Sequence, residues 1–168
     1  MLLKDLIEVS SLLGESNEPL PYHMVRNNAE ELLYTFAYGD TYWFVDFQKN
    51  KIGRQLGIVI AETTFYENPE NKLIFSTTNK FTYSGSVFGT VVAIIQDVFA
   101  HLDAIVFIGS ADRISLYKRL IRKFATVYHT YRFDDNSGSL WVMCKEELQP
   151  DVLDVIQNHS ANIIRNKT

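Results

Sequence analysis

The segment Asp103–Ser110 (DAIVFIGS) is a continuous apolar run that lies between two helical patterns. It is too short for a helix, and its lack of polar residues is typical of a strand buried on both faces. Before it, apolar residues recur at helical spacing over Val87–Leu102 and cover more than one face. After it, Asp112–Ala125 has apolar residues on one face only. We therefore expect a central strand between two helices that cover a sheet.

The other apolar segments alternate with polar residues, a pattern that predicts strands. Gly39-Asp40 separates two of these segments and predicts a hairpin. Further strands are expected both before the first helix and after the second. In chain order, the strands predicted in addition to the central one are 32–38, 41–47, 55–65, 72–81, 127–133 and 139–145.

Both ends of the chain carry amphipathic helical patterns. The first covers residues 1–13 and is followed by Gly14, and the last covers 150–164 and begins with Pro150. Residues 14–27 are polar and contain two prolines, so they are predicted to be a connecting loop. We expect one α+β domain over 1–168 with a mixed, mostly antiparallel sheet. Its parts are an N-terminal helical extension (1–31), a core (32–146) and a C-terminal helix (150–164).

Composition excludes several classes of protein. The chain has 168 residues, 46% of them hydrophobic, and can bury a core as one domain. The net charge of −4 gives no general attraction to nucleic acid or to an anionic membrane. Its start lacks the pattern of a signal peptide, and no stretch of 18 apolar residues predicts a membrane span. These features favour a cytoplasmic location.

The sequence does not predict a metal site or a nucleophilic cysteine. Cys144 is the single cysteine, which excludes an internal disulfide and a thiolate-rich zinc site, and its strand context predicts a buried thiol. The four histidines have no metal-ligand spacing. Val45–Lys49 (VDFQK) is similar to a nuclease strand that carries a carboxylate and a lysine, but the position of a second acidic ligand is missing.

The order of elements, together with YSGSVFGTVVAIIQDVF and IVFIGSADRISLYKRLIRKF, resembles the core of the GNAT acyltransferase superfamily. More closely, these two segments and the hairpin ahead of them resemble small, uncharacterised GNAT-like proteins of bacteria and their phages, and the resemblance covers roughly residues 32–145. The resemblance implies a gap between two central strands in which the pantetheine of an acyl-CoA lies alongside the sheet. It also implies a pyrophosphate site in a Gln/Arg-x-x-Gly-x-Gly/Ala loop at the start of the first core helix.

Gly85, Ser86 and Gly89 occupy the position of that loop but do not match its pattern. Three residues rather than one separate the two glycines, no Gln or Arg lies just ahead, and Phe88 is expected to crowd a phosphate. Unpaired amides and the helix dipole favour an anion at any helix start. Two interpretations therefore remain open, a phosphate site for acetyl-CoA and a plain turn that begins a buried helix, and the second is favoured.

Tyr117 corresponds, by the same resemblance, to a tyrosine that protonates the departing thiolate. A tyrosine hydroxyl can do so from hydrogen-bonding distance. Tyr117 also lies on the apolar face of its predicted helix, where a structural tyrosine belongs. Both roles stay open, as a catalytic acid and as a core residue.

A basic face on the second core helix is the most concentrated charge in this acidic chain. It can be a solvated face, or it can bind an acidic protein partner. No aromatic residues interleave with it, so nucleic acid is not favoured as a partner. The apolar faces of the terminal helices can cap the sheet or form a homodimer. The residues of this basic face are Arg113, Lys118, Arg119, Arg122 and Lys123.

Two functions follow from these patterns. The first is a GNAT-like binding or regulatory protein without a functional acyl-CoA loop, which uses no cofactor. A role in conflict between phage and host is suggested by the resemblance alone. The alternative is an acyl-CoA-dependent N-acyltransferase that uses acetyl-CoA and acts on an amine. The absent loop pattern favours the first.

Overall fold

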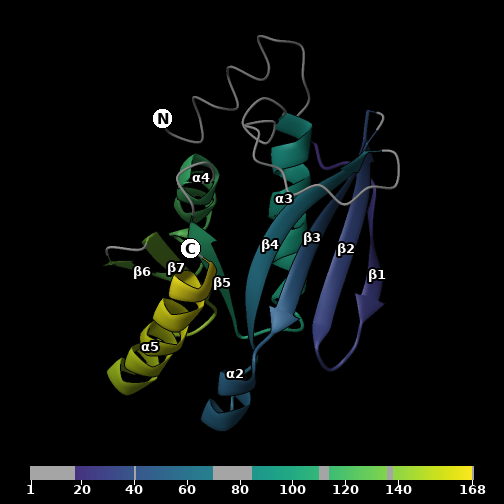
Figure 1. Cartoon of the computed structure of the whole chain (residues 1–168). Helices are drawn as coiled ribbons and strands as arrows, with labels where there is room; N and C mark the ends of the chain where they lie inside the picture. Colours follow the sequence, from purple (N-terminus) through teal and green to yellow (C-terminus); the bar gives the residue numbers. More distant parts are fainter. Residues whose placement is uncertain (1–17, 40, 70–84, 110–113, 136–137, 168) are drawn as a thin grey trace.

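The computed structural model describes residues 18–39, 41–69, 85–109, 114–135 and 138–167. These residues form an α+β domain with one mixed sheet of seven strands, in the order β1-β2-β3-β4-β5-β7-β6 (Figure 1). The strands are β1 (Tyr22–Asn27), β2 (Glu31–Tyr38), β3 (Thr41–Lys49), β4 (Ile60–Pro69), β5 (Ala104–Gly109), β6 (His129–Asp135) and β7 (Gly138–Cys144). The described helices are α2 (Lys51–Leu56), α3 (Gly85–Val98), α4 (Ile114–Phe124) and α5 (Pro150–Lys167).

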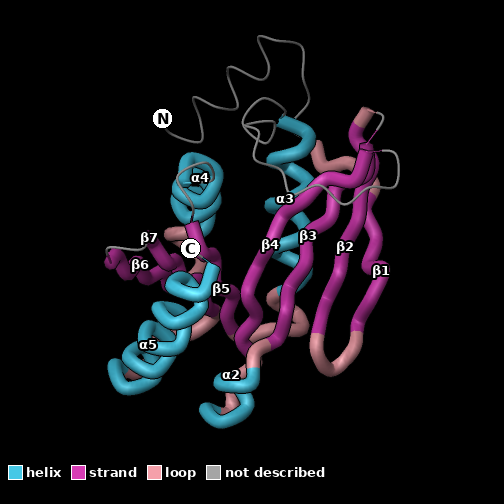
Figure 2. Tube along the Cα trace, in the orientation of Figure 1, coloured by secondary structure: helices cyan, strands magenta, loops and turns pink. Residues whose placement is uncertain are grey.

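The central strand is confirmed as β5. It pairs in parallel with β4 on one side and antiparallel with β7 on the other. Ile105, Val106 and Phe107 are buried, because α3 and α4 cover one face of the sheet here and α5 covers the other (Figure 2). The parallel pairing follows from the crossover through α3, since a strand that returns through a helix runs in the same direction.

Two hydrophobic clusters lie on opposite faces of the sheet. The larger joins α3 and α4 to the inner faces of β2, β3, β4, β5 and β7. The smaller lies beneath α5, where Ile156 packs with residues of β5 and β7, and Leu56 of α2 packs against its edge. In Figure 1, the front face of β1–β3 has no described helix over it. This open face carries the polar cluster described below.

Strand β1 lies where the sequence predicts a connecting loop. It pairs antiparallel with β2, and its Tyr22 and Met24 pack against the larger cluster. Two contacts attach this segment to α3. The Leu20 amide donates to Thr90 Oγ1 at 2.8 Å, and the Tyr22 hydroxyl donates to Asp97 Oδ2 at 2.6 Å. The pairing with β2 and these distant contacts override the loop-like local sequence.

Other boundaries also differ from the sequence expectations. Residues 51–56 form α2, so the strand expected from residue 55 begins at Ile60, and it continues through Pro69. Helix α3 begins at Gly85, two residues before the expected start, and ends at Val98. Helix α5 covers Pro150–Lys167, where 150–164 was expected. The helix expected over 1–13 and the strand expected over 72–81 lie outside the described residues.

Candidate functional site

Strands β4 and β5 separate after a short parallel ladder. Four residue pairs join them, from Ile60–Ala104 to Thr63–Phe107. Beyond this point β4 stays paired with β3 as far as Pro69, while β5 stays paired with β7 as far as Gly109. Figure 1 shows the two strands diverging toward their carboxyl ends. This is the point at which the GNAT resemblance implies a gap for a cofactor.

Four aromatic side chains pack at this separation, on the face covered by α3 and α4. The Phe65 and Phe107 rings, from β4 and β5, are stacked with centroids 6.2 Å apart. The ring of Tyr117, from α4, lies 6.0 Å from Phe65 and 5.1 Å from Phe107. Trp141 of β7 is 5.8 Å from Tyr117. All four side chains are buried, so this face of the separation is filled by the protein's own core.

Tyr117 is 1% exposed and belongs to this aromatic cluster. The structure thus places the predicted acid beside the strand separation and within the core. A core role accounts for its burial and its three ring contacts. Its role as a catalytic acid stays a prediction.

Gly85, Ser86 and Gly89 lie inside the first turns of α3, not in a loop ahead of it. Gly85 is buried, and the Ser86 carbonyl accepts a hydrogen bond from Thr90 Oγ1 at 2.6 Å. Phe88 is 5% exposed and packs in the larger cluster. Its side chain therefore points into the core, and the expectation that it crowds a phosphate stays a prediction. Binding of a cofactor by the other three residues stays a prediction.

The basic face of α4 divides into an exposed part and a partly buried part. Lys118 and Arg122 are exposed, and Lys123 is half-buried. Arg119 is also half-buried, and its Nη1 has no hydrogen-bond partner among the described residues. Burial lowers the pKa of Arg119, and the charge of Arg122 lowers it further. Arg113 lies outside the described residues. The exposed part can meet a partner without disturbing the core.

A carboxyl pair on the open face was missed by the sequence analysis. Leu33 of β2 is opposite Asp46 of β3, and Glu31 is opposite Gln48, so the two acids are diagonal neighbours on one face. Asp46 is 7% exposed, and its side chain shares a hydrogen bond with Glu31. Gln48 Nε2 donates to Asp46 Oδ2 at 3.1 Å, whereas Asp46 Oδ1 has no donor among the described residues.

The surroundings shift the pKa values of these two carboxyls in opposite directions. Burial, followed by the hydrogen bond with Glu31, raises the pKa of Asp46 from 3.8 to about 7. The hydrogen bonds from Asp46 and Arg26 lower the pKa of Glu31. Arg26 Nη1 forms an ion pair with Glu31 Oε1. Below about pH 7 these shifts favour a proton on Asp46 and a negative charge on Glu31, which Arg26 balances. The two acids are 15 positions apart in the sequence, so only the strand register could have revealed them.

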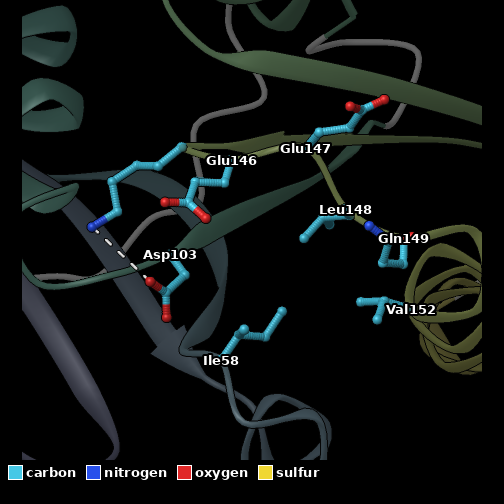
Figure 3. Close-up of a pocket in the computed structure, with 8 residues that line it drawn as sticks. Ile58, Asp103, Glu146, Glu147, Leu148, Gln149 and Val152 are labelled. Carbon is cyan, nitrogen blue, oxygen red and sulfur yellow. Dashed lines mark ion pairs between the residues drawn. The ribbon is translucent and has the colours of Figure 1, made fainter.

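A cavity of about 400 Å³ lies where β7 leads into α5 (Figure 3). In Figure 3 the Glu146 carboxylate points toward Asp103, whereas Glu147 points away. Asp103 Oδ2 accepts a hydrogen bond from the Val59 amide at 2.7 Å, and its Oδ1 lies 4.0 Å from Lys145 Nζ. The Asp103 backbone also bonds with Val59 and Lys145. These contacts give Asp103 a structural role in joining the starts of β4 and β5 to the end of β7.

Three further observations bear on the sequence expectations. Cys144 is a buried free thiol, as expected, and burial raises its pKa to about 11. Among the described residues, no group of three or more His, Cys, Asp or Glu side chains could bind a metal ion. No helix within the described ranges is long and apolar enough to cross a membrane.

Comparison with known proteins gave no match to a family model, to a curated protein or to a solved structure.

Proposed function

We propose that this protein is a GNAT-like binding or regulatory protein in which core side chains occupy the position of the acyl-CoA. The observation that carries the proposal is the aromatic cluster of Phe65, Phe107, Tyr117 and Trp141 at the separation of β4 and β5. All four side chains are at most 2% exposed. A pantetheine arm that entered from this face would have to displace at least one of them.

Displacement of such a ring is energetically unfavourable. Full burial of a Phe side chain contributes roughly 1.5–3 kcal/mol, and each aromatic contact adds about 0.5–1.5 kcal/mol. Millimolar binding of a ligand corresponds to only about 4 kcal/mol. Moving one ring into water therefore consumes most of the affinity that a weakly bound cofactor supplies, which supports a site that does not take acyl-CoA.

A binding role leaves the exposed part of the α4 basic face as the surface for a partner. Lys118 and Arg122 lie on a helix whose opposite face, with Leu120 and Phe124, is committed to the core. A cluster of like charge steers an oppositely charged partner at long range. An acidic protein is therefore the proposed partner, and phage–host conflict remains a context suggested by the resemblance alone.

The second candidate is an acyl-CoA-dependent N-acyltransferase. Two observations favour it. Helix α3 begins near the diverging end of the sheet without an acidic residue in its first turn, so its dipole is not offset there. Tyr117 lies beside the strand separation, where the resemblance implies the acid. This function requires the aromatic cluster to rearrange when the cofactor binds.

Titration with acetyl-CoA, followed by thermal unfolding, separates the two functions. A ligand at one hundred times its dissociation constant stabilises the folded state by about 2.7 kcal/mol. For a domain of this size that gain raises the melting temperature by about 5 °C or more. The proposal predicts no significant shift at about 1 mM acetyl-CoA. Micromolar affinity contradicts it, and its loss in Gly89→Ala would then place the cofactor at the start of α3.

A further inference from the structure

The cavity between the end of β7 and the start of α5 has an apolar wall built from three segments. Ile58 lies just before β4, Leu148 lies between β7 and α5, and Val152 is in the first turn of α5. All three side chains are half-buried and pack against the smaller hydrophobic cluster. In Figure 3 they point from different sides toward the same space. The wall can therefore cover an apolar group that enters from solvent.

Hydrogen bonds of the main chain hold the segments around the cavity in place. The Asp103 amide donates to the Val59 carbonyl at 2.9 Å, and the Val59 amide donates to Asp103 Oδ2 at 2.7 Å. The Lys145 amide donates to the Asp103 carbonyl at 3.1 Å. The Leu148 amide donates to the Tyr131 hydroxyl at 3.2 Å. A site that is already formed loses little entropy of its own when a ligand binds.

Carboxylates lie at one end of the cavity, beside the apolar wall. In Figure 3 the Glu146 carboxylate points toward Asp103, and the neighbouring Glu147 points away. Asp103 Oδ1 also lies 4.0 Å from Lys145 Nζ. Asp103 and Glu146 together carry two negative charges, and Lys145 carries one positive charge. These three lining residues therefore leave an excess of one negative charge beside an apolar surface.

We propose that this cavity binds a small aliphatic amine in its protonated form. The alkyl chain lies against Ile58, Leu148 and Val152, and the ammonium group lies between Asp103 and Glu146. A primary ammonium group has three donors, and it is charged at neutral pH because its pKa is near that of lysine, about 10.4. The cavity volume of about 400 Å³ lies within the range of roughly 300–1,000 Å³ that is typical of small-molecule sites.

The charge of the cavity selects among ligands of similar size. A carboxylate or phosphate would be repelled by Asp103 and Glu146. A neutral alkyl chain would use the apolar wall but not the carboxylates. The site lies at the starts of β4 and β5, whereas these strands separate toward their carboxyl ends, so it does not depend on the function proposed for that separation.

NMR titration of the full chain with n-pentylamine at pH 7 tests the proposal. The methyl signals of Ile58, Leu148 and Val152 should shift together and saturate, with a dissociation constant of about 1–10 mM for so small a ligand. 1-Pentanol has the same alkyl chain without the charge, and it should bind at least about fivefold more weakly. The absence of a saturable shift up to about 50 mM amine, fivefold above the weakest expected dissociation constant, overturns the proposal. Equal binding of the alcohol also overturns it.

A pair of adjacent variants separates the site from a general attraction of cations to this acidic chain. Glu146→Gln and Glu147→Gln remove the same charge from neighbouring exposed residues, so neither should affect folding. Glu146→Gln should weaken the binding of pentylamine about threefold, the size expected for one exposed ion pair. Glu147→Gln is the matched control and should leave the dissociation constant nearly unchanged, because its side chain points away from the cavity. Equal weakening in both variants would show that only the net charge matters, and the proposal would fail.

Discussion

Truncation of Phe107 tests whether the separation of β4 and β5 is a packed core. Phe107 is 0% exposed, and its ring contacts Phe65 and Tyr117. Replacing a buried Phe by Ala removes the transfer free energy of the ring and leaves a cavity. The unfolding free energy then falls by about 3–5 kcal/mol. The two lost ring contacts place Phe107→Ala toward the upper part of this range.

Urea unfolding provides the assay. With a slope of about 2 kcal/mol per molar urea, the midpoint should fall by about 1.5–2.5 M. Phe133→Ala is the matched control, because Phe133 is half-buried on edge strand β6 and packs against the smaller cluster. The Phe133→Ala variant should lose about 1–2 kcal/mol of unfolding free energy. If the unfolding free energy of Phe107→Ala falls by less than about 1.5 kcal/mol, or by no more than that of the control, the separation is loosely filled and is not a packed core.

Three further predictions concern the other sites. Asp103→Ala should lower the unfolding free energy by about 1 kcal/mol in a urea titration. Asp103→Asn should lose less, because its side-chain oxygen can still accept the hydrogen bond from the Val59 amide. Equal losses in the two variants would exclude this hydrogen bond as the cause. Arg119→Glu should lower the melting temperature more than Lys118→Glu, because Arg119 is half-buried and Lys118 is exposed; the reverse order would contradict this division of the basic face. Cys144 should react with iodoacetamide much more slowly in the native protein than in urea, because burial excludes the reagent and raises the pKa of the thiol to about 11; equal rates would contradict its burial.

The elements that the sequence predicts well are those whose pattern and burial agree. Strand β5 is buried on both faces and has an uninterrupted apolar run. Helix α4 combines a basic face with an apolar face, and Tyr117, Leu120 and Phe124 pack inward as expected. The hairpin of β2 and β3 turns at Gly39, which has a positive φ of 61° that favours glycine. In each case the local sequence and the tertiary structure favour the same conformation.

The elements that the sequence misses depend on contacts between distant residues. Strand β1 has only Tyr22 and Met24 facing the core, so its alternation is too weak to stand out from a loop. Its pairing with β2 and its bonds to α3 decide its structure. Helix α2 ends at Leu56 and so takes up the first two residues of the strand expected over 55–65. The Asp46–Glu31 pair was missed for the same reason, because diagonal neighbours exist only once the β2–β3 register is fixed.

We propose that aromatic side chains occupy the point where β4 and β5 separate, in the place of an acyl-CoA. NMR contacts between these rings, recorded with and without about 5 mM acetyl-CoA, test it most directly, since that concentration exceeds a millimolar dissociation constant. We expect contacts from Phe107 to Phe65 and to Tyr117 in both spectra, and an unchanged indole signal of Trp141. Loss of the Phe65–Phe107 contact together with a shifted Trp141 signal on addition of acetyl-CoA would contradict it.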